Sequence, residues 1–363
     1  MMELKSTPLL VRHQNLNALM APFGGWNMPI QYEGIIAEHR WCREKASLFD
    51  ICHMGEFLLR GDLEASGIEQ VFTFSVKSIP VGRSRYGFLL NEKGGIIDDL
   101  IVFRLAEDEA MVVVNAATIE NDFAVIRSRL KPGADFIDIS AVTGKLDLQG
   151  PLSREVMVAH FGEEILRIPY FKFIRTNVLG ADAIISRTGY TGELGYEIFL
   201  PAEKVEELWS LLLSDERVKP AGLGARDVLR LEVGYSLYGS DIDETTTPFE
   251  AGLGAFVDMS REFPGKQVLL RQQHEGVPRT RIAFRCSSRR SPRHHYEIIQ
   301  NGKLTGSVTS GVFSPMLGCG IGLGYVAPGA ATLGTPLIIR QGNVSIEAEV
   351  VDIPFFTGGS VRS

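Results

Sequence analysis

The stretch that organises this sequence is Asn91-Glu92-Lys93-Gly94-Gly95-Ile96-Ile97-Asp98-Asp99-Leu100-Ile101-Val102-Phe103. A Gly-Gly turn followed by Ile, Val and Phe predicts a hairpin turn and its second strand. Two adjacent carboxylates are an unusual start for an apolar strand. Because successive side chains of a strand point to opposite faces, Asp98 and Asp99 are not expected to share a site.

The more informative of the two carboxylates is Asp99. If it points inward with Ile101 and Phe103, it is a negative charge at the rim of an apolar pocket. A half-buried carboxylate needs a cation, a proton or the hydrogen-bond donors of a ligand. The alternative is that one aspartate caps the turn and both are solvated, and the stretch alone leaves both possibilities open.

Length and composition indicate a multi-domain globular protein. A chain of 363 residues exceeds the size at which a single core keeps growing, so two or three domains are expected. The apolar fraction of 45% and the charged fraction of 22% are ordinary for a folded protein, which argues against disorder. A net charge of −7 argues against a nucleic-acid partner.

No apolar run approaches membrane-spanning length, so no membrane partner is expected. Met1-Met2-Glu3-Leu4-Lys5 has neither the basic start and apolar core of a secretory signal nor the Arg-rich character of a transit peptide. The chain is therefore expected to be cytoplasmic.

Metal-ligand spacings are missing from the sequence. Cys42, Cys52, Cys286 and Cys319 form no C-x-x-C pair, and the seven histidines include no H-x-x-x-H spacing. Cys52 and His53 are adjacent, but neighbours on a strand face apart, so a buried cysteine and a hydrogen-bonded histidine are expected there. We predict no metal.

Periodicity predicts helices and strands in alternating groups. The expected helices span residues 7–20, 35–48, 62–74, 116–130, 155–161, 205–213, 222–232 and 263–274; the expected strands span 49–51, 56–60, 86–90, 98–104, 111–115, 145–149 and 183–186. The order helix, three strands, helix between 62 and 130 resembles part of a ferredoxin-type unit. After a linker at 275–278, strands at 281–286, 296–300, 306–311, 317–326, 336–340 and 345–351 predict a separate small barrel or sandwich.

Three further positions carry possible chemistry. In the glycine-rich segment 187–198, Tyr190, Tyr196 and Glu197 place ring faces and a carboxylate near each other. This is a fitting receptor for a flat heterocycle with an amidine-like N–H edge, although a decorated hairpin would look the same. Arg226, at the start of a helix, is a candidate carboxylate clamp, with an ion pair to Asp227 or Glu232 as the alternative. Asn115 ends an apolar strand and either reaches a ligand or caps the next helix.

Taken together and in order, several motifs resemble those of one family. They are Phe23-Gly24-Gly25-Trp26, His53-Met54-Gly55-Glu56, 94–100, Val114-Asn115-Ala116-Ala117, Leu148-Gln149-Gly150-Pro151, 186–197, 222–232, Ser307-Val308-Thr309-Ser310-Gly311 and Phe313-Ser314-Pro315. Along essentially its whole length the chain resembles the T protein of the glycine cleavage system, a folate-dependent aminomethyltransferase.

This resemblance implies an α+β fold, a three-domain cloverleaf with ferredoxin-like α+β domains and a C-terminal small β-barrel. The implied domains are residues 1–50 plus 140–275, which bind folate, an inserted domain at 51–139, and the barrel at 280–363. The implied reaction transfers the methylene of an aminomethyl group, carried on the lipoyl arm of the H protein, to tetrahydrofolate in a central channel. Its products are methylenetetrahydrofolate, ammonia and the reduced arm.

The resemblance also implies roles for single residues. Asp99 matches the catalytic carboxylate, Glu197 the acceptor for the pterin edge, and Tyr190 and Arg226 further ligand contacts. The remaining matches are Tyr86, Asn115 and Tyr235, which line the channel, and Arg362, which matches if the tail aligns without gaps. A fixed carboxylate suits the reaction because positive charge develops on the carbon that loses ammonia and on the attacking nitrogen. It can also take the proton that the folate amine releases.

Relatives with the same fold supply the alternatives. A folate-binding iron–sulfur assembly protein would be expected to show a Lys-Gly-Cys-Tyr type motif, whereas residues 240–248 contain no cysteine. A folate-dependent demethylase usually loses parts of the Gly-Gly-x-x-Asp-Asp and Arg-Thr-Gly-Tyr-Thr-Gly patterns, both of which are intact here. Sarcosine and dimethylglycine oxidising enzymes carry an extra flavin domain, for which this chain is too short.

Overall fold

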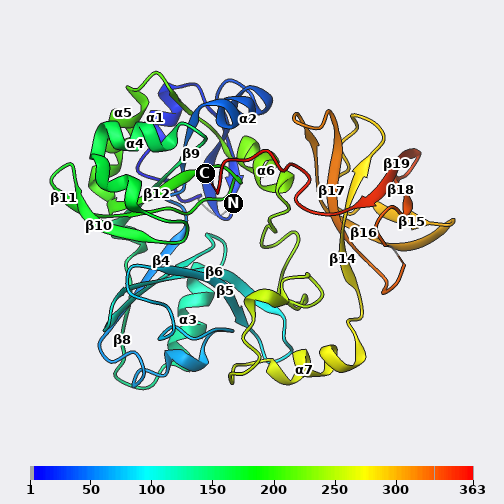
Figure 1. The fold of residues 1–363 in the computed structure, drawn as a ribbon, viewed down its shortest axis with the longest axis horizontal. Helices are drawn as coiled ribbons and strands as arrows, with labels where there is room; N and C mark the ends of the chain where they lie inside the picture. The colour runs from blue at the N-terminus through cyan, green and yellow to red at the C-terminus, as the bar shows by residue number, and fades with distance from the viewer. Residues whose placement is uncertain (1–3, 331, 363) are drawn as a thin grey trace.

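A computed structural model describes residues 4–330 and 332–362, so the first three residues of the Met1–Lys5 stretch lie outside the described residues. The chain forms three lobes around a common centre (Figure 1). Each lobe is built on its own β-sheet, and the third sheet closes into a barrel. The predicted α+β class with a C-terminal barrel is confirmed.

The first lobe has a six-stranded sheet in the order β10-β11-β12-β9-β3-β13. Its strands are β3 (Ala46–Asp50), β9 (Thr143–Gln149), β10 (Phe173–Val178), β11 (Ala181–Ser186), β12 (Gly195–Pro201) and β13 (Val218–Pro220). Its helices are α1 (Leu10–Asn15), α2 (Ile35–Glu44), α4 (Ser153–Phe161), α5 (Val205–Leu213) and α6 (Leu223–Glu232), and a hairpin of β1 (Leu19–Phe23) and β2 (Trp26–Gln31) precedes α2.

Strand β9 shows how the two faces of this sheet differ. Leu146 and Leu148 pack into the core against α4 and α5, while Lys145, Asp147 and Gln149 point to the other face. All three polar residues are nevertheless buried. The second face of the sheet is therefore covered by another part of the protein.

The second lobe has a five-stranded antiparallel sheet in the order β5-β6-β7-β4-β8. Its elements are β4 (Gly55–Arg60), β5 (Ser84–Leu90), β6 (Ile96–Ala106), β7 (Glu109–Val114), β8 (Asp135–Asp138) and α3 (Ile119–Arg129). The predicted hairpin forms at the Gly-Gly turn. Gly94 has a φ of +79°, which glycine tolerates without strain, and the Asn91 amide donates to the Gly95 carbonyl at 2.9 Å.

The third lobe is a closed barrel in the order β14-β17-β16-β15-β18-β19. Its strands are β14 (Thr280–Cys286), β15 (Glu297–Gln300), β16 (Lys303–Ser314), β17 (Cys319–Val326), β18 (Pro336–Gln341) and β19 (Val344–Val351). Before the barrel, a segment that includes α7 (Lys266–Glu275) packs Ile242, Phe263 and Leu269 against Phe88 and Ile96 of the second lobe. Short 3₁₀ turns lie at η1 (Ile68–Gln70), η2 (Ser140–Val142), η3 (Glu163–Arg167), η4 (Ala202–Lys204) and η5 (Gly254–Phe256).

The first two sheets meet through one apolar contact surface. Leu58, Phe103 and Met111 of the second sheet pack with Phe173 and Phe199 of the first, and the ring centroids of Phe103 and Phe199 are 5.4 Å apart. The same face of β6 carries Asp99 and Ile101, whereas Leu100 and Val102 pack into the opposite core. The predicted inward orientation of Asp99 places it at the junction of two lobes.

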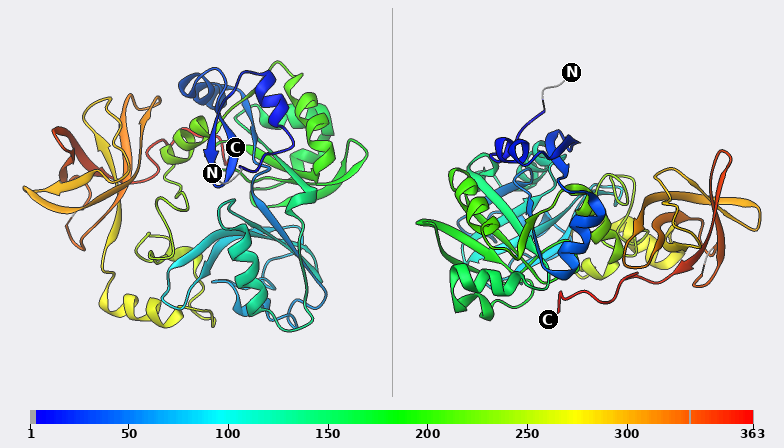
Figure 2. Two further views of the ribbon diagram at one scale, coloured as in Figure 1. Left: turned by 180° about the vertical axis from the view of Figure 1, so that it is seen from behind. Right: turned by 90° about the horizontal axis from the view of Figure 1, so that it is seen from above.

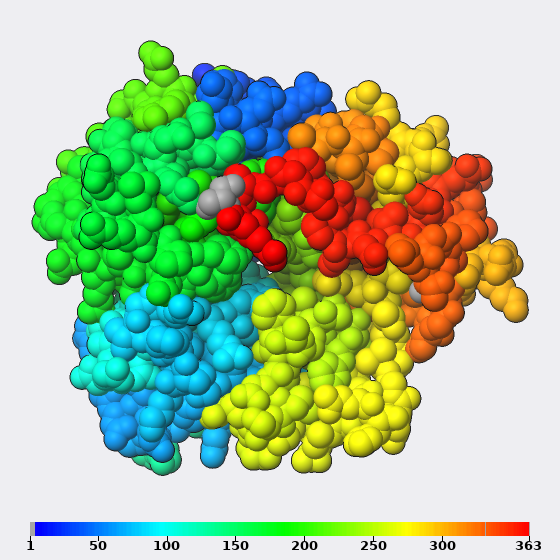
Figure 3. Space-filling model, in the orientation of Figure 1, coloured from blue at the N-terminus to red at the C-terminus, as the bar shows by residue number. Residues whose placement is uncertain are grey.

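The C-terminal tail returns from the barrel to the first lobe. The Phe356 amide donates to the Glu232 carbonyl at 2.8 Å, and the Val361 amide donates to the Gly192 carbonyl at 3.3 Å. The tail crosses one face of the molecule in the space-filling view (Figure 3). The first described segment, with α1, and the tail at 352–362 lie on opposite faces of the molecule, as the view from above shows (Figure 2).

Three predicted helices are wrong in part or in full. Residues 62–74 form turns and η1 because Asp62 accepts the amides of Glu64 and Ala65, and Gly67 takes a φ of +85°. The helix predicted at 35–48 ends at Glu44, and the next residues join the sheet as β3. The helix predicted at 7–20 is limited to α1.

The predicted domain boundaries of 1–50 plus 140–275, 51–139 and 280–363 stay a prediction. The strands of the three sheets fall within those ranges. Within residues 4–330 and 332–362, no helix is both long and apolar enough to cross a membrane.

Candidate active site

Asp99 lies at the centre of a small hydrogen-bonded group. The Tyr86 hydroxyl donates to Oδ2 of Asp99 at 2.9 Å, and Nδ2 of Asn115 donates to Oδ1 at 2.9 Å. All three side chains are half-buried, in contrast to the buried strands that carry them. The ring of Phe256 packs edge-on against Tyr86 at 4.9 Å. Asp99 is therefore oriented by two donors and still accessible.

Asn115 joins the two carboxylates that the strand alternation separates. Its Nδ2 also donates to Oδ1 of Asp98 at 2.8 Å, and its backbone amide donates to Oδ2 of Asp98 at 2.9 Å. The side chain does not cap α3, so the capping alternative for Asn115 is wrong. The expectation that Asp98 and Asp99 share no site is also wrong, because one amide at the end of the neighbouring strand β7 reaches both.

Burial raises the pKa of Asp99 to about 6, against the hydrogen bonds from Tyr86 and Asn115, which favour the charged form. The negative charge of Asp241 adds to the increase. A carboxylate with this pKa is mostly ionised near neutral pH and still able to accept a proton, which is the range suited to a general base.

Glu197 lies in a second polar group, on the buried face of the first sheet. It is 5% exposed and accepts a hydrogen bond from the Thr188 hydroxyl at 2.6 Å. Nζ of Lys145 is 3.7 Å from its Oε1. In the sheet Glu197 pairs with Asp147, whose pKa burial raises to about 6.

Arg226 forms an ion pair with Asp147, so the alternative of a partner at Asp227 or Glu232 is wrong. Its guanidinium also lies over the ring of Tyr190, at 5.2 Å from the centroid. The Tyr190 ring stacks with Tyr235 at 5.8 Å, and its hydroxyl donates to the carbonyl of Ser236.

The predicted site residues fall into two groups that face each other across the junction. Tyr86, Asp99 and Asn115 form the first, and Tyr190, Glu197, Arg226 and Tyr235 form the second. Burial raises the pKa of the Tyr190 hydroxyl, the charge of Arg230 opposes that increase, and the charge of Asp99 adds to it. Asp99 of the first group is therefore close to Tyr190 of the second.

Arg362 is exposed. Its charge opposes the increase that burial causes in the pKa of Tyr170, whose hydroxyl interacts with that of Tyr235 in the second group. The role of Arg362 stays a prediction.

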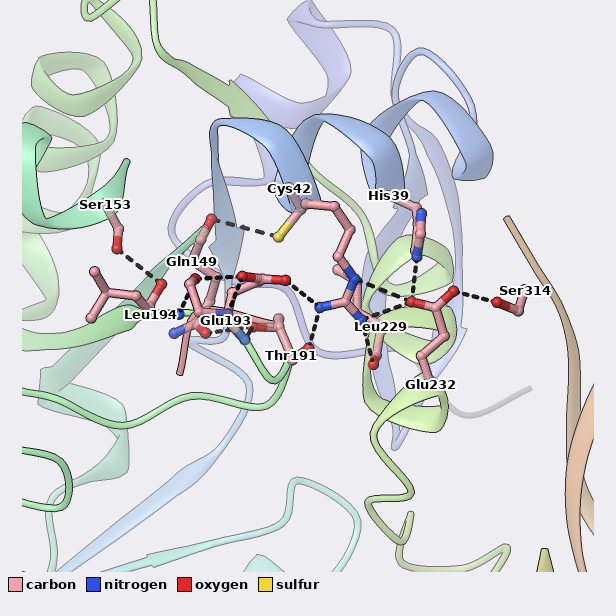
Figure 4. A network of polar contacts seen from close by, with 12 residues as sticks. His39, Cys42, Gln149, Ser153, Thr191, Glu193, Leu194, Leu229, Glu232 and Ser314 are labelled. Atoms are coloured by element: carbon pink, nitrogen blue, oxygen red, sulfur yellow. Dashed lines mark hydrogen bonds and ion pairs between the residues drawn. The ribbon is translucent and has the colours of Figure 1, made fainter. Parts of the chain in front are cut away.

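A network of buried polar contacts holds the loop that carries Tyr190 (Figure 4). Arg43 of α2 donates to Glu193 at 2.7 Å, to the Thr191 carbonyl at 2.8 Å and to Glu232 of α6 at 2.7 Å. Glu193 in turn accepts the Ser360 amide of the tail at 2.9 Å. The loop is thereby fixed to two helices and to the C-terminal tail.

The barrel joins the same network. Glu232 also accepts from His39 at 2.8 Å and from the Ser314 hydroxyl of β16 at 2.6 Å. Arg43, Glu193 and Glu232 were not among the predicted site residues, because nothing in their local sequence marks them as buried.

Sequence reasoning also missed Asp98, Asp122, Lys145 and Asp147 as members of the site. The Lys-Leu-Asp-Leu-Gln alternation of 145–149 is that of a strand with one solvated face. The alternation was the available signal, but other elements bury the polar side: Arg226 of α6 pairs with Asp147, and Thr188 and Thr191 of the neighbouring loop hydrogen-bond to Gln149.

His53 is buried, and its Nδ1 has no hydrogen-bond partner within the described residues, so the expected hydrogen-bonded histidine is wrong at this nitrogen. Burial lowers the pKa of His53 to about 4. Between pH 6.5 and 4 the unfolded chain therefore binds more protons at this residue than the folded chain does. The protein should lose about 3 kcal/mol of stability from His53 as pH falls through that window.

Replacing His53 by Gln should remove this pH dependence. Urea unfolding of both proteins at several pH values from 4 to 7 measures it, as the difference between their unfolding free energies. The free energy of the native protein should fall more steeply with decreasing pH. Parallel curves for the two proteins would show that His53 binds a proton as easily in the folded state as in the unfolded chain.

Within residues 4–330 and 332–362, no group of three or more His, Cys, Asp or Glu side chains is arranged to hold a metal ion.

Comparisons with known proteins agree with this architecture. The family model of the GCVT N-terminal domain matches residues 9–261, and that of the glycine cleavage T-protein C-terminal barrel domain matches 279–357. The aminomethyltransferase of Halothermothrix orenii is 43% identical over 97% of this chain and 100% of that protein. The aminomethyltransferase of Thermotoga maritima is 42% identical, over 99% of each.

A solved structure shows the same fold over nearly the whole chain. The glycine cleavage system aminomethyltransferase T from Bartonella henselae is 34% identical, with a TM-score of 0.93 and 99% of each chain covered. Fold and comparisons define a one-carbon transferase that ends in a small β-barrel. The chain belongs to the glycine cleavage T-protein family, that of the aminomethyltransferases.

Proposed function

We propose that this chain transfers the methylene of an aminomethyl group from the lipoyl arm of the H protein to tetrahydrofolate. The products are methylenetetrahydrofolate, ammonia and the reduced arm. The observation that carries the proposal is the half-buried Asp99, held by Tyr86 and Asn115 and facing a second group of aromatic and charged side chains. Aminomethyltransferases of this family are folate-dependent.

The second group suits the pterin ring of the folate. Glu197 can accept the paired N–H edge of the ring, and Thr188 and Lys145 hold its carboxylate in place. Tyr190 and Arg226 offer flat faces for contact with the ring. Six further side chains of the two groups are partly exposed and can also touch a ligand: Tyr86, Asp99, Asn115, Tyr190, Arg226 and Tyr235.

Asp99 suits the transfer step. As the aminomethyl carbon loses ammonia, positive charge develops on that carbon and on the attacking folate nitrogen. A carboxylate in a site with little water stabilises both charges. Two nitrogen-bound hydrogens leave the folate in the reaction, one for the departing ammonia and one for the lipoyl sulfur, and Asp99 can accept and pass on one of them. Atoms balance without an oxidant or a covalent link to the enzyme.

Replacing Glu197 by Gln should weaken folate binding more than catalysis. The variant loses the charged acceptor and places an NH₂ group against the N–H edge of the ring. Hydrogen bonds to charged groups are each worth about 1.5–3 kcal/mol, so KM for tetrahydrofolate should rise roughly 10- to 100-fold while kcat changes little. Steady-state kinetics with tetrahydrofolate varied would measure this. A matched loss in kcat with KM unchanged would assign Glu197 to the chemical step instead.

The function itself is tested with the purified chain and H protein loaded with the aminomethyl group. Ammonia and methylenetetrahydrofolate are followed with and without tetrahydrofolate. With tetrahydrofolate, equal amounts of both products are expected; without it no methylenetetrahydrofolate can form, and ammonia release should be slow. Folate binding without turnover would refute the proposal, and turnover of a methylated amine or sulfur compound in place of the loaded H protein would favour a demethylase. A cytoplasmic location stays a prediction.

A further inference from the structure

Next to Asp99 lies a pair of buried carboxyl groups that the proposed reaction does not use. Asp98 and Asp122 of α3 are both fully buried and face each other within hydrogen-bonding reach. In the described part of the chain neither oxygen of Asp122 accepts a hydrogen bond from a donor group. The nearby Thr118 hydroxyl donates instead to the Asn115 carbonyl at 3.1 Å.

The strongest charges that act on these two groups are negative. Asp99 lies on β6, and Glu244 belongs to the segment before the barrel. Tyr238 of the same segment is near enough that the charge of Asp98 adds to the increase that burial causes in its pKa. Two ionised carboxylates cannot lie together in such surroundings without a large cost, so one of them must hold a proton. Burial raises the pKa of Asp122 to about 7 and the pKa of Asp98 well above its usual range.

The hydrogen bonds decide which carboxyl group carries the proton. Asp98 accepts two N–H groups from Asn115, at 2.8 and 2.9 Å, and these bonds favour its charged form. Asp122 accepts none. The favourable arrangement is a protonated Asp122 whose carboxyl O–H donates to an ionised Asp98.

We propose that Asp98 and Asp122 hold one proton between them, with Asp122 as the donor, and that this pair positions the Asn115 amide against Asp99. Asn115 links the pair to Asp99, because its Nδ2 donates both to Asp98 and to Oδ1 of Asp99. With Asn115 fixed, both oxygens of Asp99 keep their donors. The inference rests on the proposed function, since it concerns the carboxylate assigned to the transfer step.

The test compares Asp122→Asn, which keeps a donor toward Asp98, with Asp122→Leu, which has a similar size and no donor. Glu120→Gln, an exposed change on the same helix, serves as the control. Single-turnover rates are measured from pH 5.5 to 9 with saturating tetrahydrofolate and loaded H protein. Infrared spectra of the native protein and Asp122→Asn are recorded in the carbonyl region of protonated carboxyl groups.

In Asp122→Leu no donor stabilises the charge of Asp98, and Asn115 is no longer held in place against Asp99. The pKa of Asp99 should therefore rise. The rate should fall about tenfold or more, and KM for tetrahydrofolate should change by less than about threefold. The acid limb of the pH–rate profile should move to higher pH by about half a unit. Asp122→Asn should recover most of the lost rate. The native spectrum should contain a protonated carboxyl band that Asp122→Asn lacks.

Equal rates and an unmoved acid limb in the two variants would overturn the proposal, as would an identical carbonyl region in native protein and Asp122→Asn. If Asp122→Leu does not fold, the infrared comparison decides. The result is separable from failure of the proposed function: a fully active Asp99→Asn would refute the role of Asp99 but leave the protonated band in place.

Discussion

Replacing Asp99 by Asn should lower kcat by about 10²- to 10⁴-fold, with tetrahydrofolate binding largely kept. The variant has nearly the same shape, and Tyr86 and Asn115 still surround it, but it has no charge to stabilise the developing cation and no basic oxygen for the proton. Product formation from loaded H protein gives kcat, and calorimetric titration with tetrahydrofolate gives the dissociation constant.

A suitable control is Asp108→Asn, a change in the exposed turn that follows β6. It should leave both constants as in the native protein. An Asp99→Asn protein that turns over within about threefold of the native rate would remove this residue from the chemical step.

Replacing Arg43 by Met should destabilise the protein by about 3–5 kcal/mol, the largest effect on stability that we expect from a single change. Arg43 is the cation between Glu193 and Glu232, whose side chains are at most 3% exposed. Methionine fills the space but leaves both carboxylates without their charged partner. Chemical or thermal unfolding would measure the loss, from the transition that occurs at the lowest denaturant concentration or temperature.

The matched control is Arg285→Met on the barrel, where Arg285 and Glu349 form an ion pair in which both side chains are about half exposed. Exposed pairs are worth about 0–1 kcal/mol, so this change should be nearly neutral. Similar effects of the two substitutions would mean that the Arg43 network is solvated. Faster proteolysis of the C-terminal tail in Arg43→Met would support its link through Glu193 to Ser360.

The orientation of Asp99 could be predicted from the sequence because it depends on the alternation of one strand. The bridging role of Asn115 could not, since it depends on how β7 ends beside β6, where Val113 pairs with Ile101. The partner of Arg226 lies 79 residues away along the chain, in a strand whose polar face looked solvated. Residues 62–74 have the apolar spacing of a helix, but their apolar side chains reach the core from turns.

What escaped prediction depends on packing between elements that are far apart in the sequence. Asp98 is buried next to Asp122 of α3, and Asp147 is buried next to Arg226 of α6. Such packing brings charged groups together, and local patterns report only the surroundings within one element. The resemblance to a family supplied the site positions that periodicity could not.

The most direct test of the central claim is the pH dependence of the single-turnover rate, measured on the native protein with saturating tetrahydrofolate and loaded H protein. If ionised Asp99 carries the transfer, the rate should rise as pH increases through about 6, the pKa to which burial raises this carboxyl, and the rise should vanish in Asp99→Asn. A native rate that is flat between pH 5 and 7, or the same rise in both proteins, would contradict the account.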